Sequence, residues 1–221
     1  MNTTPNSSTR RHAGTGPRRS PRRHVAAIVV LGLLLVACGK DKSSKQLSGY
    51  QLNPAPEVGA LSLPDASNNG SAFTFKAPAG RYLLVYFGYT NCPDVCPTTL
   101  SDIKKALTHI GGNASKVDLA MITIDPARDT GDLLTNYVKS FIPDAHALRT
   151  DDSTALQTTA TRFGAAYTVT KDAKGQEEVS HTGNVYIVDP TGKVVLEWPF
   201  GIGPDSMAID LDILFSGALS S

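Results

Sequence analysis

The sequence predicts an α/β domain built on a mixed β-sheet with helices against it. Two apolar runs, 82–87 and 119–124, have the pattern of buried central strands. Between them, apolar residues recur at helical spacing over 100–110, and a Gly-Gly pair that follows predicts the helix end. Residues 184–198 contain two short strands around a four-residue turn, which is typical of a hairpin. This order indicates parallel and antiparallel neighbours in one sheet.

The remaining elements follow from the same periodicities and from residues that cap helices. They are a helix at 133–141 closed by Pro143, a helix capped by Asp151 or Asp152 and ended by Gly164, a strand at 167–170, and a last helix from Pro204. The whole order fits a thioredoxin-like layout, with a mixed central β-sheet flanked by helices.

The first 37 residues have the composition of an export signal. Residues 1–24 hold six arginines and no acidic residue, and an apolar run follows from Val25 to Ala37. This run is short for a membrane span and fits the apolar core of a secretory signal peptide. Cys38 comes directly after it and resembles the cysteine of a bacterial lipobox. The resemblance implies a lipid-modified first residue in the mature chain.

We therefore expect an exported protein, anchored by lipid to the cell membrane on its extracytoplasmic side. Two alternatives are an uncleaved short anchor and a plain secretory signal in which Cys38 is incidental. Two arginine pairs, Arg10-Arg11 and Arg18-Arg19, hint at twin-arginine export, although the residues around them fit that signal poorly. The export route, general or twin-arginine, stays open.

The chain divides into three predicted parts with different charge. They are a signal peptide at 1–37, a flexible tether at 38–71 rich in Gly, Ser, Asn, Pro and Lys, and a folded domain at 72–221. The net charge of the whole chain is +1, from 21 basic and 20 acidic residues. Without the signal, 15 basic residues face 20 acidic ones, a net charge of −5. An acidic exported domain argues against binding to nucleic acid.

Reactive chemistry is expected at Cys92 and Cys96, which lie between the first long strand and the helix after it. If Cys96 lies in the first turn of that helix, the helix N-terminus favours its thiolate. Three fates are open for the pair: a structural disulfide, a redox couple or a metal site. Three residues separate the cysteines, so both sulfurs can face one ion, and two soft thiolates favour Cu(I) and accept Zn. A trigonal site then needs a third ligand.

One of five histidines is the best candidate for that ligand. His12 and His24 lie in the signal, His109 lies near the end of the first long helix, and His146 lies in a polar loop. His181 lies in a Gly-containing loop before the strand at 184–188. In a thioredoxin-like layout that loop packs beside the cysteine loop, so we expect His181 to complete the group.

At these residues the sequence resembles the Sco/SenC family of copper chaperones. Three collinear motifs carry the resemblance: Tyr86-Phe87-Gly88-Tyr89-Thr90-Asn91-Cys92-Pro93-Asp94-Val95-Cys96-Pro97, Asp125-Pro126-Ala127-Arg128-Asp129-Thr130, and Ser180-His181-Thr182-Gly183 before Val185-Tyr186-Ile187-Val188-Asp189. One departure is Ala127, where the family often has an acidic residue.

The resemblance implies one copper ion, Cu(I) or Cu(II), held by Cys92, Cys96 and His181. It also implies delivery to the dinuclear copper site of cytochrome c oxidase. The expected partners are the oxidase subunit that carries this site and an upstream copper donor. Asp125-Pro126 either ends a strand or tunes the copper site from behind its ligands.

Two enzymatic functions compete with copper delivery, which is not itself an enzymatic turnover. One is a thiol-disulfide oxidoreductase that acts through Cys92 and Cys96 on cysteines of the oxidase subunit. Reductases of this fold usually place a cis-proline opposite the active cysteines, and no proline occurs between Thr159 and Asp189. The other is a thioredoxin-fold peroxidase, which would use a single low-pKa thiol in a different motif.

Overall fold

The computed structural model describes residues 46–171, 173–175 and 177–217. No helix within these ranges is long and apolar enough to cross a membrane. The helices are α1 (Val95–His109), α2 (Gly131–Phe141), α3 (Ser153–Phe163) and α4 (Pro204–Phe215), with short 3₁₀ turns η1 (Ala66–Asn68) and η2 (Gly111–Lys116). The strands are β1 (Ser62–Asp65), β2 (Ser71–Thr74), β3 (Tyr82–Gly88), β4 (Val117–Thr123), β5 (His146–Leu148), β6 (Tyr167–Lys171), β7 (Glu177–His181), β8 (Val185–Val188) and β9 (Val194–Trp198).

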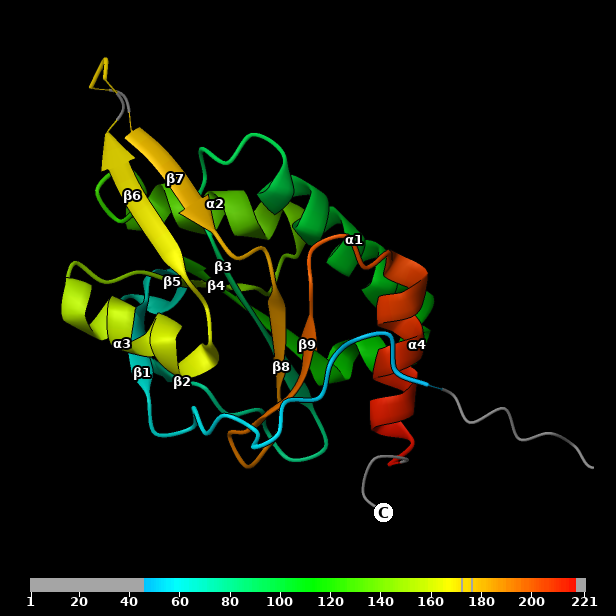
Figure 1. Cartoon of the computed structure of the whole chain (residues 1–221). Coiled ribbons are helices and arrows are strands. Elements are labelled where there is room, and N and C mark those ends of the chain that lie inside the picture. Colours follow the sequence, from blue (N-terminus) through cyan, green and yellow to red (C-terminus); the bar gives the residue numbers. More distant parts are fainter. Residues whose placement is uncertain (1–45, 172, 176, 218–221) are drawn as a thin grey trace, which may run out of the picture. The chain divides into compact units, whose positions relative to one another are not determined.

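A seven-stranded mixed sheet forms the centre of the domain, in the order β2-β1-β5-β4-β3-β8-β9 (Figure 1). β3 pairs in parallel with β4 and antiparallel with β8. Residues 83–88 are buried, as expected for a strand with neighbours on both edges and layers on both faces. The predicted thioredoxin-like α/β fold with a mixed central sheet is confirmed. The loop that contains Cys92 follows directly after β3.

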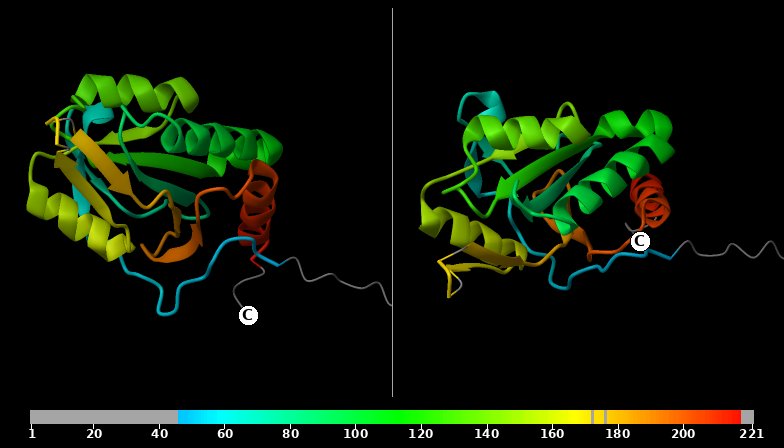
Figure 2. Two further views of the ribbon diagram at one scale, coloured as in Figure 1. Left: turned by 45° about the horizontal axis from the view of Figure 1, so that its top comes forward. Right: turned by 90° about the horizontal axis from the view of Figure 1, so that it is seen from above.

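Helices cover both faces of this sheet. Figure 2 shows α1 and α2 on one face and α3 on the other. Alternate side chains of β3 therefore enter different layers: Phe87 contacts Phe163 of α3, with ring centroids 5.6 Å apart, whereas Tyr86 faces the layer that holds α1. Both aromatic residues are buried, and together they couple the sheet to both helical layers.

The predicted cap residues of α3 are confirmed. The Asp152 carboxylate, and not that of Asp151, accepts hydrogen bonds from the N–H groups of Thr154 and Ala155, at 2.9 and 3.0 Å. Gly164 ends the helix with a φ of 79°, a left-handed conformation that favours glycine. These are local interactions, which is why the sequence alone predicts them.

The predicted boundary between tether and domain at residues 71 and 72 is wrong, because the folded unit begins earlier. β1 belongs to the central sheet, and Val58 and Leu63 are buried. The N–H groups of Ser48 and Gly49 donate to the buried Asp210 carboxylate on α4, at 2.8 and 2.9 Å. Composition alone made this segment resemble a linker, whereas its order depends on contacts with residues about 160 positions away.

Two predicted loops are strands in the structure. His146 begins β5, which pairs in parallel with β4, and its Nδ1 lies 2.7 Å from the buried Asp65 carboxylate. β7 pairs antiparallel with β6 and ends at His181, so this residue closes a strand and does not lie in a loop. β5 has only three residues and β7 is polar, so neither shows the apolar alternation that reveals a strand in sequence.

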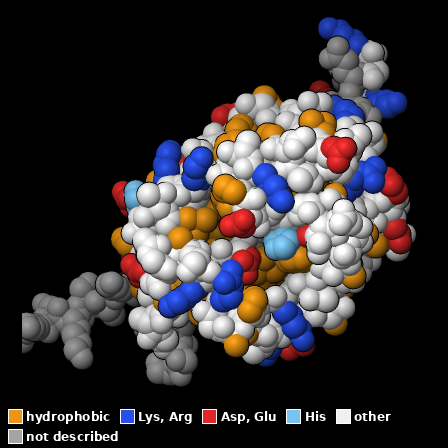
Figure 3. Space-filling view, turned by 180° about the vertical axis from the view of Figure 1, so that it is seen from behind, with side chains coloured by type: hydrophobic (Ala, Val, Ile, Leu, Met, Phe, Trp, Pro, Cys, Tyr) orange, Lys and Arg blue, Asp and Glu red, His pale blue; other side chains and the backbone are white. Residues whose placement is uncertain are grey.

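The face that carries α1 and α2 has a mixed surface. Figure 3 shows basic and acidic side chains interspersed there, with hydrophobic side chains in separate patches. This face therefore has no field of a single sign.

Candidate metal centre

The two cysteines flank the start of α1. Cys92 lies in the loop after β3, and Cys96 lies in the first turn of the helix. Both thiols are free, and Cys92 is 7 % exposed whereas Cys96 is fully buried. The Cys96 N–H donates to the Cys92 Sγ at 3.2 Å. An otherwise unpaired amide of the helix start is therefore directed at the sulfur of Cys92.

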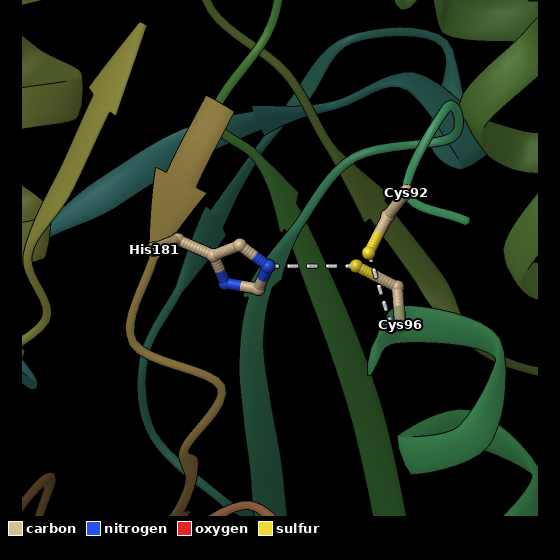
Figure 4. Close-up of side chains that lie close together, drawn as sticks. All are labelled: Cys92, Cys96 and His181. Atoms are coloured by element: carbon tan, nitrogen blue, oxygen red, sulfur yellow. Dashed lines mark hydrogen bonds between the residues drawn. The ribbon is translucent and has the colours of Figure 1, made fainter. Parts of the chain in front are cut away.

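His181 reaches this loop from the end of β7 (Figure 4). Its Nε2 lies 3.7 Å from the Cys96 Sγ, and its Nδ1 donates to the carbonyl oxygen of Thr182 at 3.0 Å. A carbonyl oxygen only accepts, so Nδ1 carries the proton and the Nε2 lone pair is directed toward the sulfurs. This is the tautomer that a metal-binding imidazole needs.

The three side chains form one cluster, as the sequence predicts. The sulfur atoms of Cys92 and Cys96 and the nearest ring nitrogen of His181 all lie within 4.8 Å of one another. Two sulfurs and one imidazole nitrogen form a soft donor set, which suits Cu(I) and also Zn. The same proximity of two thiols permits oxidation to a disulfide.

Burial controls the protonation of this cluster. It lowers the pKa of His181 and is partly opposed by hydrogen bonds to backbone groups of Thr182 and Phe87, so the imidazole is neutral at neutral pH. Burial also raises the pKa of Cys96 to about 12, with a further increase from the adjacent Cys92. Cys96 does lie in the first turn of α1, as expected, but burial opposes the thiolate that the helix N-terminus was expected to favour.

Two tyrosine rings pack against the imidazole ring of His181. The ring of His181 makes T-shaped contacts with Tyr86 and Tyr89, at centroid distances of 6.2 and 5.9 Å. Tyr86 comes from β3 and Tyr89 from the loop after it, so the segment that delivers the cysteines also orients the histidine. Such contacts limit ring rotation and keep Nε2 directed at the cysteine loop.

A buried carboxylate that sequence reasoning did not single out supports the cysteine loop. Asp129 is fully buried and accepts hydrogen bonds from the Thr90 N–H at 3.1 Å, from the Thr90 hydroxyl and from the Thr123 hydroxyl at 2.6 Å. Its carbonyl oxygen accepts from Arg149 at 2.7 Å. The sequence contained a clue to this role, because Asp129 is the second acidic residue after the end of β4.

Asp125 is connected to the metal cluster indirectly, through Arg128 and Tyr89. Its carboxylate pairs with Arg128, and the Arg128 guanidinium lies 5.9 Å from the centroid of the Tyr89 ring. The chain of contacts from Asp125 through Arg128 to Tyr89 ends at the aromatic ring that contacts His181. Of the two interpretations of Asp125-Pro126, the end of a strand is confirmed, because β4 ends at Thr123, whereas tuning of a metal stays a prediction.

The other candidate residues lie elsewhere. His109, at the end of α1, pairs with Asp205 at 3.0 Å, and His146 pairs with Asp65. His12, His24 and Cys38 lie outside the described residues. Elimination on the basis of sequence context therefore selected the histidine that the structure places beside the cysteines.

An open hollow of about 610 Å³ adjoins the cluster. The loop residues Tyr89, Asn91 and Pro93 line one side with Arg128, and residues of β6 and β7 line the other. Asn91 and Pro93 flank Cys92, and the β7 lining includes the residue before His181. The hollow therefore lies next to the segments that carry Cys92 and His181, although none of the three cluster residues lines it.

The fold and the cluster together define a class: a thioredoxin-like domain with a soft-metal site made of two thiols and one imidazole. A family model described as SCO1/SenC matches residues 55–215. A SCO2-like protein of Rickettsia typhi is 30% identical over 177 residues, which cover 77% of this chain and 85% of that protein. The chain belongs to the SCO1/SenC family.

Solved structures of the family are similar over most of the described domain. Bradyrhizobium japonicum ScoI with copper bound matches with a TM-score of 0.59 and 34% identity, covering 69% of this chain and 95% of that chain. Arabidopsis thaliana ScoI with copper bound matches with a TM-score of 0.62 and 27% identity, covering 73% and 97%. Both proteins were determined as copper complexes.

Proposed function

We propose that this protein is a copper metallochaperone that binds one copper ion through Cys92, Cys96 and His181. The observation that carries the proposal is the cluster itself, in which three soft or borderline donor atoms lie within 4.8 Å of one another. Membership of a family with copper-bound structures supports copper over zinc as the ion.

Copper in this scheme is cargo, and transfer occurs by ligand exchange. The cluster offers three protein ligands, and the hollow next to the cysteine loop and β7 is the side from which we expect an incoming donor atom to approach. A trigonal site with an accessible side can accept a fourth ligand and then lose one of its own. We propose that the acceptor is the cytochrome c oxidase subunit that carries the dinuclear copper site, as the family resemblance implies, with an upstream protein supplying the copper.

The site of action in this proposal is the extracytoplasmic face of the membrane. The basic and apolar segments before Cys38 support export, and a diacyl chain on Cys38 would hold the protein at the membrane surface. The folded unit would then meet an oxidase subunit at the same surface.

Copper titration of the full chain in detergent tests this function. We expect one equivalent of copper to bind, with a sulfur-to-Cu(II) charge-transfer band for the oxidised ion. His181→Ala should weaken Cu(I) binding more than about tenfold without unfolding the domain, since even outer partners of metal ligands cost 10–100-fold. Cys92→Ser should abolish both copper binding and disulfide formation. The matched control is His109→Ala, because His109 lies outside the cluster.

Thiol-disulfide exchange is the second candidate function, and the two free thiols favour it. An insulin-type disulfide reduction assay on the same preparation separates the two. Absence of copper binding together with robust disulfide reduction would reject the chaperone. Copper binding without reduction would reject the oxidoreductase.

A further inference from the structure

Tyr86 carries a buried hydroxyl that makes no well-formed hydrogen bond in the metal-free structure. The residue is fully buried, and its hydroxyl oxygen forms no hydrogen bond with any residue that the structure describes. Leaving a buried hydroxyl unpaired costs about 1–3 kcal/mol. Phenylalanine would fit the same core without this cost, so the hydroxyl needs an explanation beyond packing.

The hydroxyl lies beside the Cys96 sulfur. Cys96 and Thr99 are the polar side chains next to it, and the Tyr86 hydroxyl and the Cys96 thiol influence each other. A Cβ atom added at Gly88 would meet both Tyr86 Cε1, at 2.8 Å, and the Cys96 Sγ, at 3.1 Å. The edge of the tyrosine ring and the sulfur therefore border the same small space beside Gly88.

The sulfur is a poor acceptor as a thiol and a good one as a metal-bound thiolate. A thiol sulfur accepts hydrogen bonds weakly, whereas an ionised acceptor roughly doubles the strength of a hydrogen bond. The unpaired hydroxyl of Tyr86 is thus matched to the metal-bound state of Cys96 and not to the metal-free state.

We infer that the Tyr86 hydroxyl donates a hydrogen bond to the metal-bound sulfur of Cys96 and thereby tunes the affinity and the reduction potential of the bound copper. The inference rests on the proposed function, since it concerns the copper-loaded site. Tyr86 is in this sense a positioning residue that acts through Cys96. Burial, and then the nearby Cys96, raise the pKa of Tyr86 far above its usual value, so the phenol remains a donor at any physiological pH.

The hydrogen bond has a defined electronic effect. It withdraws electron density from the sulfur, which weakens electron donation to copper and stabilises Cu(I) relative to Cu(II). It also lowers the energy of the sulfur lone pairs, so the sulfur-to-Cu(II) charge transfer needs a higher photon energy. Removal of the hydroxyl should therefore reverse both effects.

The test compares Tyr86→Phe with the matched control Tyr186→Phe in the full chain. Tyr186 is equally buried and its hydroxyl is likewise unpaired among the described residues, but the register of β3 and β8 directs it to the opposite face of the sheet. It contacts Phe163 there, with ring centroids 5.5 Å apart. The measurements are the Cu(II) charge-transfer band, the reduction potential, Cu(I) affinity by competition, and the free energy of unfolding without metal.

We expect Tyr86→Phe to shift the charge-transfer band to longer wavelength, to lower the reduction potential and to weaken Cu(I) binding about tenfold. Its metal-free stability should equal or exceed that of the wild type, and Tyr186→Phe should change none of the copper properties. A wild type that binds no copper would reject the proposed function itself. A wild type that binds copper with the same band, potential and affinity as Tyr86→Phe would reject only this inference. A larger loss of metal-free stability in Tyr86→Phe than in Tyr186→Phe would also overturn it, because the role would then be structural.

Discussion

The Asp129 carboxylate accepts both the N–H and the hydroxyl of Thr90, although 39 positions separate the two residues. Thr90 lies two residues before Cys92, so this contact links the end of β4 to the loop that carries the first sulfur. The position of Cys92 therefore depends on a buried carboxylate that does not belong to the metal cluster.

Asp129→Asn should loosen the cysteine loop. The amide nitrogen that replaces one carboxylate oxygen faces hydrogen-bond donors, so at least one buried group loses its partner. We expect the free energy of unfolding to fall by about 1–3 kcal/mol, and Cu(I) affinity to fall about tenfold. Chemical denaturation and copper competition measure the two quantities. Asp118→Asn serves as the control, because Asp118 pairs with Arg81 in a partly exposed salt bridge. Equal effects of the two variants on copper affinity would contradict the role of Asp129.

Gly88→Ala should damage the site by steric pressure. A Cβ at this position would lie 2.8 Å from Tyr86 Cε1, 3.0 Å from Met121 Cε and 3.1 Å from the Cys96 Sγ. All three neighbours are fully buried, so we expect a loss of about 1–3 kcal/mol in the free energy of unfolding. Copper affinity should fall as well, because Cys96 is displaced. In the control Gly112→Ala the added Cβ meets no atom within 4 Å, and retention of wild-type stability by both variants would refute the prediction.

The two cysteines should differ in reactivity without metal. Burial raises the pKa of Cys96 to about 12 and removes its sulfur from solvent, whereas Cys92 is 7 % exposed. Because the thiolate is the nucleophile, iodoacetamide at pH 8 should alkylate Cys92 at least about tenfold faster than Cys96. Mass spectrometry of peptides from timed samples gives both rates. In denaturant the rates should become similar, and faster labelling of Cys96 in the folded protein would contradict the assignment.

Acid should destabilise the metal-free domain partly through Asp65. Burial raises the pKa of this carboxyl, but hydrogen bonds from Ser67 and His146 outweigh it, and the net shift is downward from 3.8. A carboxyl with a lowered folded-state pKa contributes stability above its unfolded value, and that contribution is lost as the pH falls through the folded-state value. The free energy of unfolding should therefore decrease more steeply from pH 5 to pH 3 in the wild type than in Asp65→Asn. Parallel curves for the two proteins would show that Asp65 does not contribute.

Cys38→Ser should release the protein from the membrane fraction of cells. A diacyl chain gives stable membrane binding, and serine at this position cannot carry the thioether-linked lipid. Fractionation with detection of the folded domain measures the distribution, and mass spectrometry of the mature N-terminus identifies the modification. Continued membrane association of Cys38→Ser, with residues 1–37 still attached, would indicate an uncleaved anchor instead.

The sequence by itself determined the features that depend on local pattern. Apolar runs predicted β3 and β4, helical periodicity and caps predicted the helices, and the order of elements predicted the thioredoxin-like sheet. The spacing of Cys92 and Cys96 at a strand-to-helix junction indicated reactive chemistry, and the context of His181 selected it among five histidines. These inferences need only residues that are neighbours in the chain. The selection of His181 needs one rule of the fold as well, namely that the segment before β8 packs beside the cysteine loop.

Only the tertiary structure decided the features that depend on distant residues and on burial. β1 joins the sheet through partners far along the chain, so composition gave the wrong domain boundary. The burial that raises the pKa of Cys96, the hydrogen bonds of Asp129 and the unpaired hydroxyl of Tyr86 arise only once β3, β4 and α1 are packed together. Desolvation and long-range hydrogen bonds are properties of the folded environment, and no local pattern records them.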